Sequence, residues 1–337
     1  MTEMLPQPPT LPGITWRPAC KEDVAGIVAL QEAVFETDGG WREVESEILD
    51  RWTSDYCVVG EDSLVAVNDS GDVIASIWSY VPSIAETKWR AFHDNYIHPD
   101  HRTPALRDFV LQWWEARCCQ RFASKDDGLP QFLWRYAYDW QTDKIGFLEA
   151  HGYEPMRYYD ELLADLSKPI ADRSLPEGLT VQSWEKASLE DSRTVHNAAF
   201  VDHWGSQPQS EKSWAQNAND FLLREASFVV YDDGEPVSYL MAAAFPHDFA
   251  DKGRREAWIE GLGTLRSYRK RGIGSALVTL AMQKFASLDM EFAILGVDSE
   301  NSTGAYGLYE ALGFVHDRRS IAYIKRIPWT ESEHEHG

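Results

Sequence analysis

The stretch RSYRKRGIGSALVTLAMQKFASL, residues 266–288, joins a glycine-containing loop to an amphipathic helix. The segment before it, AWIEGLGTL (257–265), is typical of a strand. From Ser275 onward, apolar residues recur at helical spacing, at Leu277, Leu280, Ala281, Phe285 and Leu288. A strand, a loop and a helix in this order leave backbone N–H groups unpaired at the helix N-terminus. Together with the helix dipole, these groups predict a binding site for an anion.

The loop itself adds charge and access to this predicted site. Arg269, Lys270 and Arg271 supply positive charge, and Gly272 and Gly274 have no Cβ to keep a phosphate from the backbone. Taken alone, the pattern R-x-x-G-x-G is equally typical of a glycine-rich turn before a surface helix. A Rossmann loop would need another glycine where this chain has Leu277, and the Gly-Lys-Ser/Thr of a Walker loop is missing.

The next segment makes the pattern specific. FAILGVDSENSTGAYGLYEALGF (292–314) predicts a strand, a turn at Asn301 and a short helix that ends at Gly313. The pair YRKRGIGSAL (268–277) and Asn301 followed by GLYEALGF (307–314) resembles the GNAT superfamily of acyl-CoA-dependent N-acetyltransferases. The first part is similar to the superfamily's R/Q-x-x-G-x-G/A pyrophosphate motif, and the second to its Asn…Tyr motif.

The resemblance implies that acetyl-CoA is the acyl donor and co-substrate. Its pyrophosphate would bind the loop from Arg269 and Lys270 onward, on the amides of Arg271, Gly272, Ile273, Gly274 and Ser275. Its pantetheine arm would run beside the strand at Gly263, Thr264 and Leu265, where a backbone N–H could polarise the thioester carbonyl. Asn301 would hold the arm from the opposite side.

The same resemblance implies roles in proton transfer. Tyr309 would be the acid that protonates the departing thiolate, although it also reads as a packing residue. Glu260, on the strand before the loop, would be the base, and the alternatives are a solvated strand glutamate or a water chain that does the same work. His203 and Trp204 are candidates for the acceptor pocket, and His203 also reads as a structural wall residue.

An internal repeat divides the chain. ITWRPACKEDVAGIVALQEAVF (14–35) and LTVQSWEKASLEDSRTVHNAAF (179–200) both predict a strand followed by a helix, at an offset of 165. The hairpin patterns at 63–76 and 227–240 repeat at an offset of 164. A Pro- and Ser-containing linker, 164–178, lies between them. We therefore predict an α+β fold with mixed sheets, in two tandem GNAT domains at 14–167 and 177–328. The arrangement is similar to two-domain members such as mycothiol synthase.

The first repeat lacks the residues on which the donor site would depend. FLEAHGY (147–153) has Leu148 where LYEALGF (308–314) has Tyr309. Alignment on Arg102 and Arg269 puts Ala105 at Gly272, Arg107 at Gly274 and Pro104 at Arg271, while Asp143 falls near Asn301. We expect this domain to be non-catalytic. It could shape the acceptor site, dimerise, stabilise its neighbour or bind an acyl-CoA in an altered site.

Composition narrows the possible partners. The chain of 337 residues has a net charge of −22, so we expect neither nucleic acid nor an anionic membrane to bind it. The four cysteines form no C-x-x-C pair and have no zinc spacing, and we expect no metal. The N-terminal stretch lacks an apolar signal core and no segment approaches ~18 apolar residues, which predicts a cytoplasmic protein.

These observations predict an acetyl-CoA-dependent N-acetyltransferase. Its C-terminal domain would transfer the acetyl group by direct attack of a primary amine that belongs to a small molecule or a peptide. The alternative is a non-catalytic acyl-CoA-binding sensor or scaffold. The identity of the amine, the use of longer acyl donors and the oligomeric state stay open, because variable loops build acceptor pockets.

Overall fold

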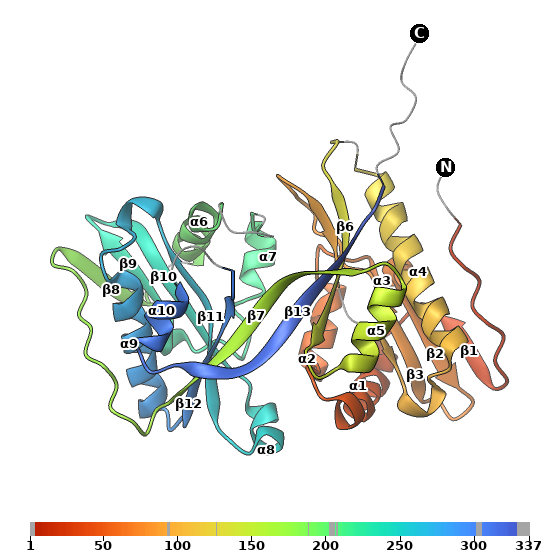
Figure 1. The fold of residues 1–337 in the computed structure, drawn as a ribbon. Coiled ribbons are helices and arrows are strands. Elements are labelled where there is room, and N and C mark those ends of the chain that lie inside the picture. Colours follow the sequence, from red (N-terminus) through yellow and green to blue (C-terminus); the bar gives the residue numbers. More distant parts are fainter. Residues whose placement is uncertain are drawn as a thin grey trace, which may run out of the picture. The chain divides into compact units, whose positions relative to one another are not determined.

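The computed structural model describes residues 4–92, 95–125, 127–187, 189–201, 206, 208–300 and 305–328. The chain forms two compact units (Figure 1). The first unit comprises Met1–Met156 with Ile321–Gly337, and the second comprises Arg157–Ser320. Each unit is described by itself below.

The first unit contains a four-stranded antiparallel sheet in the order β1-β2-β3-β5. A further strand group has the order β4-β6-β13, in which β13 (Val315–Arg326) takes part with its C-terminal end. Its strands are β1 (Ile14–Arg17), β2 (Ser63–Asn68), β3 (Val73–Trp78), β4 (Trp89–Ala91), β5 (Tyr96–Ile97) and β6 (Gln131–Tyr138). Its helices are α1 (Val24–Asp38), α2 (Glu45–Leu49), α3 (Val59–Asp62), α4 (Pro104–Ala123) and α5 (Thr142–Ala150). Short 3₁₀ turns lie at Lys21–Asp23, Asp50–Trp52 and Pro99–His101.

The second unit has a similar order of elements, with α8 where the first unit has β4 and with no helix equivalent to α3 among its described residues. Its strands are β8 (Leu179–Ser183), β9 (Phe228–Asp232), β10 (Glu235–Ala244), β11 (Glu256–Thr264) and β12 (Phe292–Asp298). Its helices are α6 (Leu189–Ala199), α7 (Glu211–Ala215), α8 (Phe249–Lys252), α9 (Ile273–Ser287) and α10 (Ala305–Glu310). Its 3₁₀ turns lie at Arg224–Ala226, Pro246–Asp248 and Arg266–Tyr268. The structure thus confirms the predicted α+β class and the tandem repeat.

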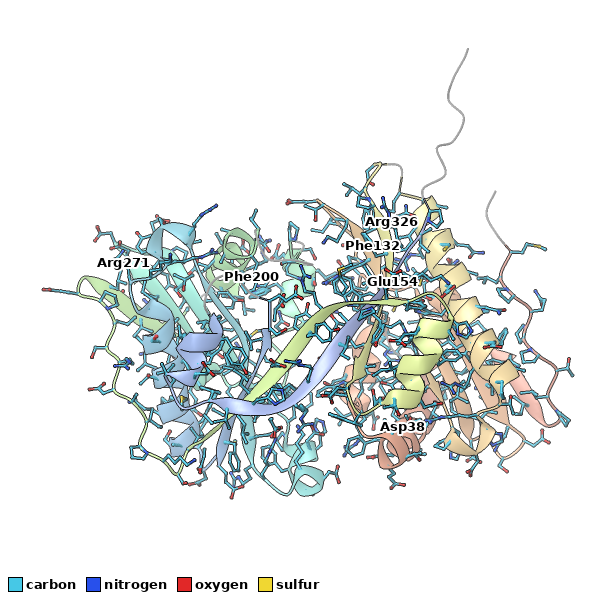
Figure 2. All side chains as sticks on the ribbon, viewed as in Figure 1. Asp38, Phe132, Glu154, Phe200, Arg271 and Arg326 are labelled. Carbon is cyan, nitrogen blue, oxygen red and sulfur yellow. The ribbon has the colours of Figure 1, made fainter. Side chains whose placement is uncertain are left out.

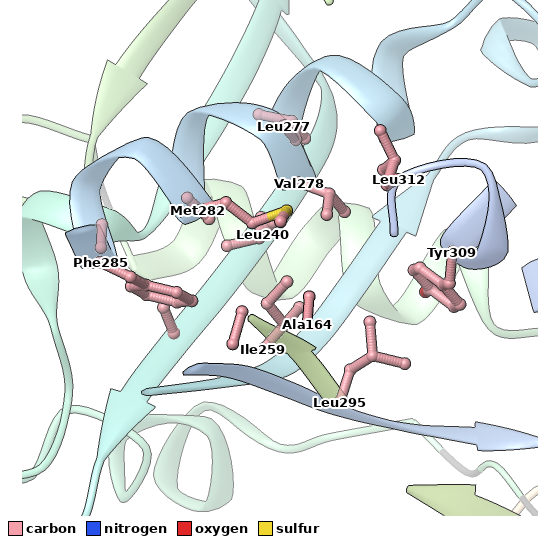
Figure 3. Close-up of a cluster of buried hydrophobic side chains, with 14 of the residues drawn as sticks. Ala164, Leu240, Ile259, Leu277, Val278, Met282, Phe285, Leu295, Tyr309 and Leu312 are labelled. Atoms are coloured by element: carbon pink, nitrogen blue, oxygen red, sulfur yellow. The ribbon is translucent and has the colours of Figure 1, made fainter. Parts of the chain in front are cut away.

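The sheet of the second unit is mixed and has a core on each face. β11 pairs in parallel with β12, whereas β8, β9, β10 and β11 pair antiparallel in sequence order. One core lies under α9 and includes Leu240, Ile259, Leu277 and Phe285 (Figure 3). The other lies under α6 and includes Val195, Trp214 and Tyr239. Both faces of β10 and β11 are therefore covered.

Two long strands cross the boundary between the units. β7 (Glu154–Asp165) begins in the first unit, and its residues 159–165 pair antiparallel with residues 292–298 of β12 in the second. β13 (Val315–Arg326) begins in the second unit, and its end follows β6 in the strand order of the first. Each unit therefore includes a strand from the other sequence repeat. The predicted limits 14–167 and 177–328 describe the repeats and stay a prediction for the domains.

Among the described helices, none has both the length and the apolar content that a membrane-spanning helix requires. Within the same ranges, no three His, Cys, Asp or Glu side chains are grouped as metal ligands would be. The cytoplasmic and metal-free assignments stay predictions.

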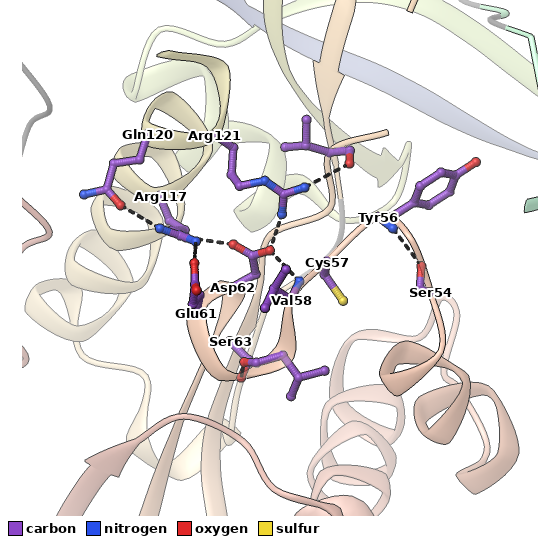
Figure 4. A network of polar contacts seen from close by, with 12 residues as sticks. Ser54, Tyr56, Cys57, Val58, Glu61, Asp62, Ser63, Arg117, Gln120 and Arg121 are labelled. Carbon is purple, nitrogen blue, oxygen red and sulfur yellow. Dashed lines mark hydrogen bonds and ion pairs between the residues drawn. The ribbon is translucent and has the colours of Figure 1, made fainter. Parts of the chain in front are cut away.

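A fully buried carboxylate connects α3 to α4 in the first unit (Figure 4). Asp62 accepts hydrogen bonds from the Val58 amide at 2.6 Å and from Arg117 Nε at 2.7 Å, and it also pairs with Arg121. Arg117 bonds to Glu61 as well, whose side chain is 68% exposed. The two carboxylates thus share a partner but differ completely in their access to water.

We expect Asp62→Ala to lower the free energy of unfolding by about 3 kcal/mol, because it leaves Arg117 and Arg121 without their buried acceptor. The matched change Glu61→Ala should cost less than about 1 kcal/mol, since water replaces an exposed ion pair. Urea unfolding followed by circular dichroism measures both variants. Equal losses in free energy of unfolding for the two variants would show that burial of the carboxylate does not determine how much this network stabilises the fold.

Candidate active site

The N-terminus of α9 lies on the surface of the second unit and has no side-chain cap. Gly272 is the N-cap residue, with φ 84°, in the left-handed region that favours glycine. A Cβ built there would meet nothing within 4 Å, so the loop has room above it. Since no side chain caps the helix, its first-turn amides can donate to an anion.

The three basic residues of the loop differ in what they contact. Arg269 donates to the Thr264 carbonyl at 3.1 Å and to the Ala199 carbonyl at 2.6 Å, so its side chain ties the loop to β11 and α6. Lys270 and Arg271 are exposed, and the Arg271 guanidinium lies 5.1 Å from the centre of the Tyr268 ring (Figure 2). Lys270 and Arg271 therefore supply the accessible charge.

The equivalent helix of the first unit, α4, satisfies its own N-terminus. Arg102 donates to the Ile97 carbonyl at 3.1 Å, five residues upstream as in Arg269, which supports the alignment of these arginines. Thr103 caps α4 by accepting from the Leu106 amide at 3.2 Å, and Pro104 has no N–H. In the first turn of α4, one backbone donor is thus bonded to the cap and another is absent.

A side chain also fills the space beside the first turn of α4. Arg107, at the position of Gly274, pairs with Asp143 of α5 at 2.9 Å and lies 4.3 Å from the centre of the Phe147 ring. At Gly274, the nearest atom to an added Cβ would be Leu308 Cδ1 of α10, at 3.6 Å. The position equivalent to Gly274 therefore carries a salt bridge to α5 in the first unit, whereas the nearest described side chains around Gly274 itself are those of Leu308 and Leu262.

β11 separates from β12 partway along its length. Parallel pairing joins residues 256–259 to residues 292–295, and both strands continue beyond the last pair. The register with β10 shifts between Met241 and Ala242, opposite Glu260, which marks a β-bulge. Glu260 therefore lies where the two parallel strands diverge.

Beyond the bulge, the direction of the backbone hydrogen bonds can be deduced from the ladder. Leu265 N donates to Val237 O at 3.0 Å, and Gly263 pairs with Tyr239. Because hydrogen-bonding direction alternates along a strand, the N–H groups of Leu262 and Thr264 point away from β10. Of the predicted contacts Gly263–Leu265, the Leu265 amide is thus already used inside the sheet, and the edge available to a ligand runs from Glu260 to Thr264.

Tyr309 is nearly buried on α10, in the same apolar cluster as Leu277 and Leu295 (Figure 3). Its ring meets Phe314 edge to face, with 5.9 Å between centroids. Desolvation raises the pKa of its hydroxyl to about 12. The hydroxyl therefore keeps its proton at neutral pH.

Glu260 has a raised pKa although its side chain reaches solvent. Protein atoms surround it closely enough that desolvation is the largest cause, and the negative charge of Glu161 is the second. Together they raise the pKa of Glu260 to about 7. Glu161 lies on β7, so a residue from the first sequence repeat acts on this carboxylate within the second unit.

Sequence reasoning missed Glu161 and a hydrogen-bonded pair beneath β11, Tyr239 and His196. Tyr239 of β10 is 1% exposed, and its hydroxyl lies 2.7 Å from His196 Nδ1 on α6. A negative charge on Tyr309 would raise the pKa of Tyr239, so the two hydroxyls are close enough to interact electrostatically. The glycines at 261 and 263 were the available sequence signal, since they mark a close approach to a strand. The predicted residues Asn301, His203 and Trp204 lie outside the described residues.

Comparisons with known proteins agree with this geometry. Residues 189–314 match the Acetyltransferase (GNAT) family. The matched residues lie within the second sequence repeat. Two solved structures share the fold over almost the whole chain. A GCN5-related N-acetyltransferase from Sphaerobacter thermophilus has a TM-score of 0.69 at 22% identity, covering 94% of this chain and 97% of that one. A tandem GNAT protein from the clavulanic acid biosynthesis pathway has a TM-score of 0.66 at 15% identity, covering 94% of this chain and all (100%) of that one.

Two curated relatives are mycothiol acetyltransferases. That of Streptomyces griseus subsp. griseus is 28% identical over 162 residues, which are 47% of this chain and 49% of the relative. That of Streptomyces avermitilis is 26% identical over 157 residues, which are 46% and 48%. The matched region thus spans about half the length of these relatives. The chain resembles them as a tandem GNAT protein.

The raised pKa of Glu260 predicts a pH-dependent cost in stability. The folded state favours the protonated carboxyl, so stability should fall as pH rises from about 4.5, the unfolded value, through about 7. Glu260→Gln should therefore be as stable as the wild type at pH 4 and more stable at pH 8. Chemical unfolding at both pH values measures this difference. Glu235→Gln, at the exposed start of β10, controls for the loss of one negative charge, and an equal gain in that variant would contradict the prediction.

Proposed function

We propose that this protein is an acetyl-CoA-dependent N-acetyltransferase whose second repeat acetylates a primary amine of a small molecule or peptide. The observation that carries the proposal is the contrast between two equivalent helices. α9 leaves its N-terminal amides uncapped beside the diverging edge of β11, whereas α4 caps its own. The match of residues 189–314 to the GNAT family supports the same reading.

The residues present fit the proposed donor. The amides from Arg271 to Ser275 and the open space at Gly272 would hold the pyrophosphate, with charge from Lys270 and Arg271. The outward N–H groups of Leu262 and Thr264 would pair with the pantetheine amides as a neighbouring strand does. When bound, acetyl-CoA supplies the activated acetyl group.

Two described side chains have properties that suit the proton transfers. Glu260, with a pKa near neutrality, would accept the proton that the amine loses as its nitrogen bonds to the thioester carbonyl carbon. Tyr309, protonated at neutral pH, would donate to the sulfur as the carbon–sulfur bond breaks. A backbone N–H of β11 would stabilise the negative charge that develops on the carbonyl oxygen.

The second candidate is a non-catalytic acyl-CoA-binding sensor or scaffold. It needs the loop of α9 but has no use for a buried phenol on α10 or for a carboxylate poised near pH 7. Tyr309 and Glu260 therefore favour an enzyme. The acceptor stays open among amino sugars, aminoglycosides, polyamines, amino acids and peptide N-termini. For the first repeat we propose a non-catalytic role.

Calorimetric titration with acetyl-CoA should give one site per chain. Gly272→Asp should abolish binding, because the new carboxylate lies where the phosphate would bind and the residue must adopt a positive φ. Ala105→Asp, at the equivalent position of the first repeat, should leave affinity unchanged. Two sites per chain, or equal losses in both variants, would contradict a non-catalytic first repeat.

Tyr309→Phe should keep acetyl-CoA affinity within a few-fold and lower turnover by about tenfold or more, because it removes only the proton donor. Tyr306→Phe, on the same helix, is the matched control and should retain turnover. CoA release with the best substrate from an amine panel measures both. Normal turnover in Tyr309→Phe would remove this residue from the mechanism, and acetyl-CoA binding without CoA release for any amine would favour the sensor.

A further inference from the structure

The ring of Tyr239 lies lengthwise beneath the donor edge of β11. A Cβ built on Gly263 would be 2.5 Å from Tyr239 Cε1, and one built on Gly261 would be 2.8 Å from its hydroxyl oxygen. Real Cβ atoms do not approach so closely, so the ring occupies the places that side chains at 261 and 263 would take. Tyr239 therefore supports β11 from Gly263 to the bulge at Glu260.

Residues of α6 and α7 hold the far end of this ring. His196 Nδ1 lies 2.7 Å from the Tyr239 hydroxyl, and the imidazole is 4.6 Å from the ring centroids of both Phe200 and Trp214. Burial raises the pKa of Tyr239, which keeps the phenol protonated. The hydroxyl is therefore fixed by one hydrogen bond in a tightly packed aromatic cluster, next to the backbone of Gly261.

The first repeat arranges the same positions in reverse. Val65 pairs with Ser76 in the first hairpin, as Val229 pairs with Tyr239 in the second, so Ser76 is equivalent to Tyr239. Ser76 in turn faces Tyr96, whereas Tyr239 faces Gly263. In the first repeat the tyrosine of this pair lies on β5, the strand equivalent to β11. In the second repeat it lies on β10, the strand beside β11.

The partner of the tyrosine also differs between the repeats. At the offset of 165 that relates α1 to α6, Gln31 takes the place of His196. Gln31 accepts a hydrogen bond from the Glu43 amide at 2.8 Å and donates one to the Glu43 carboxylate at 3.0 Å. It therefore bonds to a loop residue, whereas His196 bonds to a tyrosine of the sheet. The His196–Tyr239–Gly263 arrangement accompanies the uncapped α9, and the repeat with a capped α4 lacks it.

We propose that Tyr239 is a positioning residue for acetyl transfer and that His196 fixes its hydroxyl. The ring sets the path of β11 where the Leu262 and Thr264 amides leave the ladder, and the hydroxyl supports the bulge that carries Glu260. This inference rests on the proposed function. It explains on steric grounds why glycine occupies positions 261 and 263. A side chain at either position would push β11 away from the Tyr239 ring and move the Leu262 and Thr264 amides.

A double-mutant cycle tests the steric part. Gly263→Ala should weaken acetyl-CoA binding by about tenfold or more, because its Cβ displaces β11 or the ring. Tyr239→Ala removes the closest obstacle and gives the Phe200 ring, 3.2 Å from the added Cβ, room to move, so Gly263→Ala should cost about twofold or less in that background. Calorimetry measures all four proteins, and melting temperatures show which of them fold. Equal costs of Gly263→Ala in both backgrounds would overturn the proposal.

A second comparison tests positioning without a cavity and decides the matter where Tyr239→Ala does not fold. Tyr239→Phe and His196→Gln should lower kcat about fivefold and change the KM for acetyl-CoA less than about twofold, since the donor amides stay near their places while the bulge loses its support. Tyr96→Phe, the matched change in the first repeat, should retain kcat. Unchanged kcat in Tyr239→Phe would overturn the inference alone, whereas a wild type that does not bind acetyl-CoA would reject the proposed function as well.

Discussion

The separation of β11 from β12 after Ile259 and Leu295 is the constraint on which the rest of the second unit depends. Paired strands saturate each other's backbone, so a ligand can bind between them only where they part. The bulge at Glu260 begins this divergence, and alternation along the ladder then turns the Leu262 and Thr264 amides outward. The strand leads through Arg269 into α9, whose own amides are uncapped. Strand edge and helix end therefore present donors on one continuous stretch of chain.

The first repeat shows how the same frame becomes closed. Its arginine makes the same carbonyl contact, so the path of the loop is retained. Thr103 then caps the Leu106 amide, Pro104 has no N–H to donate, and Arg107 pairs with Asp143 of α5. Where the start of α9 has no side-chain cap, the start of α4 thus has partners inside the first unit. These contacts satisfy polar groups at and beside the helix end within the first unit itself.

Local pattern was enough to predict α9, β11 and the tandem repeat, because periodicity and turn residues act over a few positions. The predicted helix, 275–288, differs from α9 by two residues at its start and one at its end. The contact between His196 and Tyr239 joins residues 43 apart, and no local pattern encodes it. The hydrogen bonds of Arg269 to two backbone carbonyls could not be predicted for another reason. From sequence alone, a basic residue in a glycine loop is interpreted as a phosphate ligand, because its partners inside the protein are not known.

The crossing of β7 and β13 could not be deduced either, because an alternating strand fits the edge of any sheet with a matching apolar face. Its consequence is that the second unit includes a strand of the first sequence repeat. β7 belongs to the first repeat, yet Ala164 on this strand lies in the core under α9, and Glu161 raises the pKa of Glu260. Without β7, β12 would keep its pairing with β11 but lose its second paired neighbour, and the core under α9 would lose Ala164.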